Sequence, residues 1–158
     1  HNHRALDAGT AVFPFGSAPA IRLRSLYWLS MFEEAARQDR PLIFTFAPER
    51  TVPESFIAET KAAVEGHGGE VVFIELQVSP EEQMRRVETP DRKASKKIHA
   101  RDVLQKFIAS GGADYPPIPA DLVIDTEALA PEAAAQAIVE ALALEPLPEP
   151  HVMYPDPE

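Results

Sequence analysis

The fold is decided by residues 71–82, which read VVFIELQVSPEE. The first eight of these residues are the clearest strand pattern in the chain and predict a buried parallel strand. Ser79, Pro80 and the two glutamates after them combine a capping hydroxyl, a proline suited to the first helical turn and negative charge at the positive end of a helix. The stretch therefore predicts a strand followed directly by a short helix that ends near Val87.

The same alternation continues on both sides of this stretch. Upstream, the pattern of apolar residues predicts helices over residues 4–13, 17–39 and 54–65, and a short buried strand over 42–46. Downstream, a basic connector over 89–99 precedes a helix over 101–110, a strand over 121–125 and an alanine-rich helix over 131–144. Three strands, each followed by a helix, indicate an α/β fold: a parallel sheet with helices on both faces, in three layers. Ligands of such sheets bind beyond the carboxyl ends of the strands.

Length and composition limit the class of protein. The 158 residues suffice for one domain, which we place over residues 1–144, and a proline-rich tail follows over 145–158. A formal net charge of -10 argues against a nucleic-acid or membrane partner, because both reward a clustered positive field. The chain has no cysteine, which excludes disulfides and thiol nucleophiles, and it has no apolar run of membrane-spanning length. We expect a cytoplasmic protein.

The order of elements resembles the C-terminal portion of small P-loop kinases such as shikimate kinase and chloramphenicol phosphotransferase. The resemblance rests on the strand before Ser-Pro-Glu-Glu at 79–82, the arginine pair at 85–86, the basic loop, the strand at 121–125 and the Leu-Ala-Pro-Glu segment at 129–132. It runs from His1 to about Leu144. It implies a nucleotide-kinase-like fold of the P-loop NTPase type, with ATP and Mg²⁺ as cofactors.

One defining element of these kinases does not occur in the sequence. The phosphate-binding loop G-x-x-x-x-G-K-[ST] follows a central strand in the family, and the glycine-rich run at 66–69 lacks the following Lys-Ser or Lys-Thr. A sheet without its central strand would leave backbone groups and apolar faces unpaired. We therefore expect the strand, loop and first helix to lie upstream of His1 or to be supplied by a partner chain.

Phosphoryl transfer needs positive charge on the migrating group, and the basic connector supplies it. The resemblance matches Arg86 to the arginine at the end of a helix and Arg92 to the arginine of a mobile lid, so both are catalytic candidates. Arg86, Arg92, Lys97 and Thr126 are the candidate nucleotide-binding residues, Thr126 through its position after the final strand. The alternative interpretation is a solvated basic loop beside Glu81 and Glu82.

The acceptor side is predicted from the opening segment and from the loop after residue 46. By the resemblance, Asp7 orients or deprotonates the acceptor hydroxyl, and His3, Asp7, Glu49 and Arg50 are candidate substrate contacts. Glu49 and Arg50 could instead cap the next helix, and Arg22 and Arg24 could face the acceptor or simply lie on a helix surface. No metal ligand is assigned, because His1 and His3 lack a defined third partner.

The leading interpretation is an ATP-dependent kinase for a hydroxyl of a small metabolite or drug, active when the upstream phosphate loop is present. Its partners are then a nucleotide and a small-molecule alcohol. The alternative is a non-catalytic nucleotide- or ligand-binding protein that kept a kinase-like fold and lost the loop. Fold analogy does not transfer a substrate, so the acceptor is open.

Overall fold

The computed structural model describes residues 9–90, 92 and 97–146. The elements in chain order are α2 (Ala18–Arg37), α3 (Phe56–Glu65), β1 (Ile74–Gln77), α4 (Pro80–Arg86), α6 (Arg101–Ala109), β2 (Leu122–Asp125) and α7 (Pro131–Ala141). Each of these helices and both strands were predicted from the sequence, with bounds that differ by a few residues. Half of the predicted helix over 4–13 lies outside the described residues; in the other half, Gly9 and Thr10 are helical and residues 11–13 form a turn and a bend.

The described sheet has two parallel strands, β1 and β2, with Ile74 opposite Leu122 and Gln77 opposite Asp125. The predicted three-layer P-loop NTPase sheet is therefore wrong for this chain. Residues 42–46, predicted as the third strand, form no strand. Apolar side chains made this segment look like a buried strand, but a strand also needs a neighbour for its backbone, and neither β1 nor β2 pairs with it.

The strands are shorter than predicted because the chain before β2 cannot pair. Residues 116–119 contain three prolines, which donate no backbone hydrogen bond to a ladder. The pairing therefore begins at Asp121, whose amide donates to the carbonyl of Phe73 over 2.8 Å while its carboxylate accepts the Phe73 amide over 2.8 Å. This reciprocal contact fixes the register at the start of the sheet.

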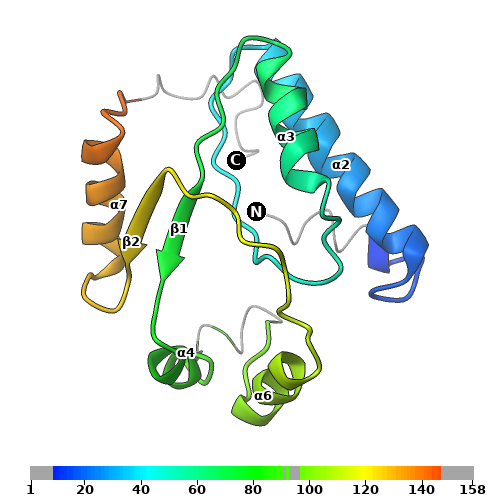
Figure 1. Ribbon diagram of the computed structural model, residues 1–158, viewed down its shortest axis with the longest axis vertical. Coiled ribbons are helices and arrows are strands. Elements are labelled where there is room, and N and C mark those ends of the chain that lie inside the picture. Colours follow the sequence, from blue (N-terminus) through cyan, green and yellow to red (C-terminus); the bar gives the residue numbers. More distant parts are fainter. Residues whose placement is uncertain (1–8, 91, 93–96, 147–158) are drawn as a thin grey trace, which may run out of the picture.

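The principal core is aromatic and lies away from the sheet, where α2 and α3 pack together (Figure 1). Trp28 and Phe32 of α2 meet Phe56 of α3, which is 2% exposed. Phe44 and Phe46 add to this core from the extended segment: Phe44 lies 4.9 Å from Phe32 and Phe46 lies 5.5 Å from Phe56, centroid to centroid. The segment is therefore held by its side chains, since its backbone has no strand partner.

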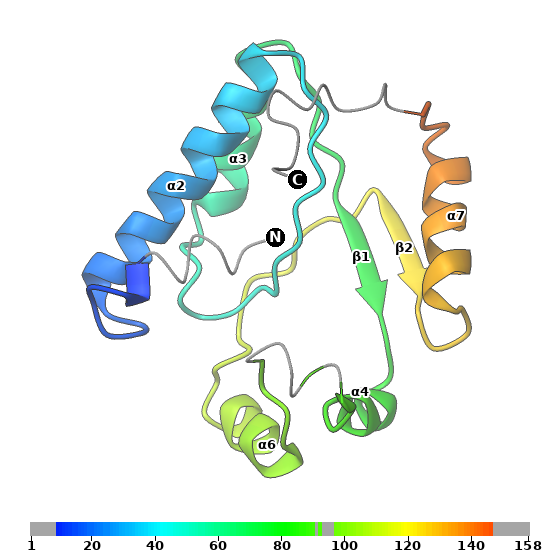
Figure 2. The same ribbon diagram turned by 180° about the vertical axis from the view of Figure 1, so that it is seen from behind.

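A helix covers one side of the sheet. Helix α7 packs on β2, where Ala134 and Ile124 are buried. Figure 2, from behind, shows the same order: α7, the two strands, the extended segment, then α2 and α3. Helices α4 and α6 lie beyond the carboxyl end of β1 (Figure 1), the end of a sheet where α/β proteins bind ligands.

Candidate functional site

The candidate site is the group of polar residues at the carboxyl ends of β1 and β2. Helix α4 begins there because Ser79 accepts the amide of Glu82 on its Oγ over 3.2 Å, and Pro80 occupies the first helical turn. One face of this short helix then presents Glu82 and Arg86, four residues apart. The predicted helix start is confirmed by this cap.

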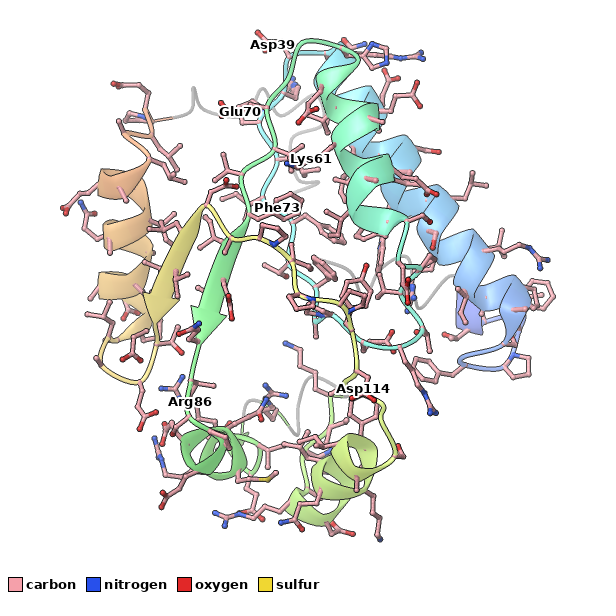
Figure 3. The ribbon with its side chains drawn as sticks, in the orientation of Figure 1. Asp39, Lys61, Glu70, Phe73, Arg86 and Asp114 are labelled. Carbon is pink, nitrogen blue, oxygen red and sulfur yellow. The ribbon has the colours of Figure 1, made fainter. Side chains whose placement is uncertain are left out.

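Arg86 and Thr126, both predicted nucleotide-binding residues, are in direct contact. The Arg86 Nη1 donates to Thr126 Oγ1 over 3.1 Å and Nη2 donates to the Thr126 carbonyl over 2.6 Å. The third nitrogen, Nε, donates to Glu82 Oε1 over 2.6 Å. Figure 3 shows Arg86 at the end of the sheet, between β1 and α4. Three of the five N–H donors of the guanidinium, one on each nitrogen, are thus bonded to protein oxygens, so Arg86 joins Glu82 to Thr126.

Thr126 in turn joins the ends of the two strands. Its amide and its hydroxyl both donate to the carbonyl of Gln77, the last residue of β1, over 2.9 Å each. The next residue, Glu127, accepts the Ser79 amide over 3.0 Å and donates its own amide to Asp125 Oδ1 over 2.8 Å. The loops after β1 and β2 are therefore fixed to each other.

Glu82 is the anionic centre of this group. Hydrogen bonds from Arg85 and Arg86 lower the pKa of the Glu82 carboxyl to about 2, so it is ionised at every physiological pH. Sequence reasoning did not select Glu82 or Glu127. The spacing of four between Glu82 and Arg86 could have identified the first, and the position of Glu127 directly after the strand could have identified the second.

Exposed cations occur both in α4, at Arg85, and in the segment after it. Arg92 and Lys97, both predicted ligands of the nucleotide, are exposed. The Arg92 amide donates to the Thr89 carbonyl over 3.1 Å, and Arg101, at the start of α6, pairs with Glu88 over 2.8 Å.

Two of the predicted acceptor residues, Glu49 and Arg50, lie in the loop between residues 42–46 and α3. Glu49 pairs with the buried Arg24 at 3.3 Å and accepts the Thr51 amide over 2.9 Å, while Arg50 donates to the carbonyl of Ser110, just after α6, over 3.3 Å. Both side chains thus contact other parts of the protein. The predicted residues His3 and Asp7 lie outside the described residues.

The fit of ATP and Mg²⁺ can be tested on these side chains. Arg92 and Lys97 are exposed cations, and three of the five N–H donors of Arg86 are bonded to Glu82 and Thr126. Across residues 9–90, 92 and 97–146, no group of three or more His, Asp or Glu side chains could hold a metal ion. The described side chains therefore offer no carboxylate cluster for Mg²⁺.

Within the same described ranges, no helix is both long and apolar enough to cross a membrane. Comparison with known proteins gives no relative: no family, no curated protein and no solved structure matches the chain.

Proposed function

We propose that the chain takes part in ATP-dependent phosphoryl transfer to a hydroxyl group of a small molecule, and that it binds the nucleotide beyond the carboxyl ends of β1 and β2. The observation that carries this proposal is the contact between Arg86 and Thr126. It joins the helix that leads into a basic segment to the loop that follows the neighbouring parallel strand. Such paired strand ends are where α/β proteins bind nucleotides.

The proposal gives each residue a role that its surroundings support. Arg92 and Lys97 contact the phosphates, because they are exposed cations in the chain that follows α4. Arg86 is a positioning residue that holds Thr126 in place. The backbone around Thr126 borders the base.

The acceptor side rests on the resemblance to small P-loop kinases. In this part of the proposal, Asp7 orients the acceptor hydroxyl and His3 contacts the acceptor. Glu49 and Arg50 shape the acceptor side through their contacts with α2 and with the loop after α6. Mg²⁺ is bound together with the phosphates, as is usual for this ion. A cytoplasmic location, where ATP is abundant, completes the proposal.

Calorimetry with ATP tests the proposal on the full chain. We expect binding, and we expect the double change Arg92→Ala with Lys97→Ala to weaken it by at least about tenfold, since each charge-assisted hydrogen bond is worth about 1.5–3 kcal/mol. Arg22→Ala is the matched control, because Arg22 is an exposed arginine on α2, remote from the strand ends. A folded chain that does not bind ATP contradicts the proposal.

A second function, nucleotide binding without catalysis, is favoured by the engagement of Arg86 with protein groups. The two functions differ in turnover. Incubation with Mg-ATP and a panel of alcohols, followed by detection of ADP, distinguishes them: ADP release dependent on an alcohol supports a kinase, whereas ATP binding without ADP release supports the binding protein.

A further inference from the structure

The strand β1 has a second edge, opposite β2. The carbonyls of Phe73 and Gln77 accept the amides of Leu122 and Thr126, so these residues face β2. Because bonding direction alternates along a parallel strand, the amides and carbonyls of Ile74 and Leu76 point to the other edge. Within residues 9–90, 92 and 97–146, β2 is the strand that pairs with β1, and it lies on the opposite side.

A second extended segment, residues 42–46, lies on that side. In Figures 1 and 2 it runs between β1 and the pair of helices α2 and α3. Phe44 and Phe46 attach it to the aromatic core, while Ile43, directly before Phe44, is 88% exposed. Among the described residues, the backbone between Leu42 and Phe46 pairs with no strand.

Exposed apolar side chains lie along this edge of β1, a strand of four residues that also carries the exposed Glu75. Leu76 is 58% exposed and Val72 is also exposed. Residues 71–78 contain neither a lysine nor a proline, the residues that commonly block an edge strand from pairing with another chain. Unpaired backbone groups together with exposed apolar side chains are the chemistry that an added β-strand satisfies.

We propose that the free edge of β1 binds an extended, apolar segment of another polypeptide as an added strand. Backbone donors and acceptors spaced along a strand require an extended peptide, since neither a helix nor a small molecule can pair with them in series. Charge argues against a second copy of this chain: its formal net charge is -10, and Glu70 and Glu75 are exposed beside the edge. The segment therefore has basic residues at its ends.

The test uses the full chain and a synthetic peptide of alternating valine and isoleucine between lysine pairs. Hydrogen exchange of individual amides is measured by NMR with and without the peptide. We expect the amides of Ile74 and Leu76 to exchange at least about tenfold more slowly with the peptide, and the amides of α7 to be unchanged. Absence of protection at saturating peptide overturns the proposal.

Two controls keep the result interpretable. Leu76→Pro removes one amide on the free edge without removing a bond to β2, so it abolishes protection at Ile74. If that variant does not fold, the same peptide with alternate amides N-methylated replaces it, and this peptide gives no protection of the natural chain. Equal protection by the methylated peptide contradicts strand addition, and protection that rises with protein concentration in the absence of peptide assigns the edge to self-association.

Discussion

At the scale of single residues, the strand ends depend on Thr126. Its hydroxyl accepts from Arg86 and donates to the carbonyl of Gln77, and its own carbonyl accepts the second Arg86 nitrogen. One small side chain thereby connects three elements: β1, α4 and the loop after β2. Arg86, predicted from the sequence as a direct phosphate ligand, acts in the structure on Thr126.

Thr126→Val keeps the shape of the side chain and removes both hydroxyl bonds. We expect a loss of about 1 kcal/mol in the free energy of unfolding, because a hydrogen bond contributes roughly that much net. For a chain of this size the melting temperature falls by about 2–4 °C. Thr45→Val, at an exposed threonine of the extended segment, is the matched control and stays within about 0.5 kcal/mol of the natural chain. Equal effects of the two changes would disprove the role of Thr126.

Glu82 makes stability depend on pH at the acid end. Hydrogen bonds from Arg85 and Arg86 lower its pKa to about 2, below the ordinary value of 4.5. A carboxyl whose pKa is lower in the folded state contributes stability above the unfolded pKa and loses it as pH falls toward the folded pKa. We expect Glu82→Gln to reduce the dependence of the urea midpoint on pH between about 4.5 and 2. An unchanged dependence in that range contradicts the two arginine contacts.

At the scale of elements, α2 is joined to the loop before α3 by a buried ion pair. Arg24 is 7% exposed, pairs with Glu49 at 3.3 Å and donates to the Thr51 carbonyl over 2.6 Å. The guanidinium also lies 4.8 Å from the Trp28 ring centroid. Glu49, predicted as a substrate contact, thus neutralises a buried charge of the protein itself.

Glu49→Ala leaves the Arg24 guanidinium buried without its carboxylate. We expect a loss of about 3 kcal/mol in urea unfolding, at the low end for a broken buried pair because the Thr51 carbonyl remains. Arg24→Met together with Glu49→Ala removes the uncompensated charge, so the double variant is more stable than Glu49→Ala alone. If the double variant is less stable than Glu49→Ala, the side chains of Arg24 and Glu49 stabilise the fold through packing and not through their charges.

The sequence allowed the helices and both paired strands to be predicted, because caps, prolines and apolar periodicity are local signals. Ser79 and Pro80 at the start of α4 and Pro131 at the start of α7 are examples. The prediction of a strand over 42–46 was wrong for a non-local reason. A strand forms only when its backbone pairs with a neighbouring strand, and the sequence of one segment does not identify that neighbour. In the candidate site, Arg86 and Thr126 were predicted through the resemblance to small P-loop kinases, but their contact depends on how β1 and β2 pair.

At the scale of the whole molecule, buried apolar side chains occur in two groups of elements, and the first group contains more of them. The aromatic core lies between α2, α3 and the extended segment, while α7 covers part of the sheet. Phe56 is at the centre of the first group, with Trp28 and Phe46 at 5.3 and 5.5 Å between ring centroids. Stability therefore depends mainly on this core.

Phe56→Ala removes the ring that Trp28, Phe32 and Phe46 share. We expect a loss of about 3–5 kcal/mol, as is usual for a buried phenylalanine, and therefore a chain that is largely unfolded by mild heating. Phe15→Ala is the control, since Phe15 is 71% exposed and its loss leaves no cavity. Circular dichroism during a thermal scan measures both; similar midpoints would contradict the position of the core.

The most direct test of the proposed site is an NMR titration of the full chain with ATP, read at each backbone amide. We expect the largest shifts at Ser79, Lys97, Thr126 and Glu127, around the carboxyl ends of β1 and β2, and little change in α2 and α3. Shifts concentrated on α2 and α3, or no shifts in a folded chain, contradict nucleotide binding at the strand ends.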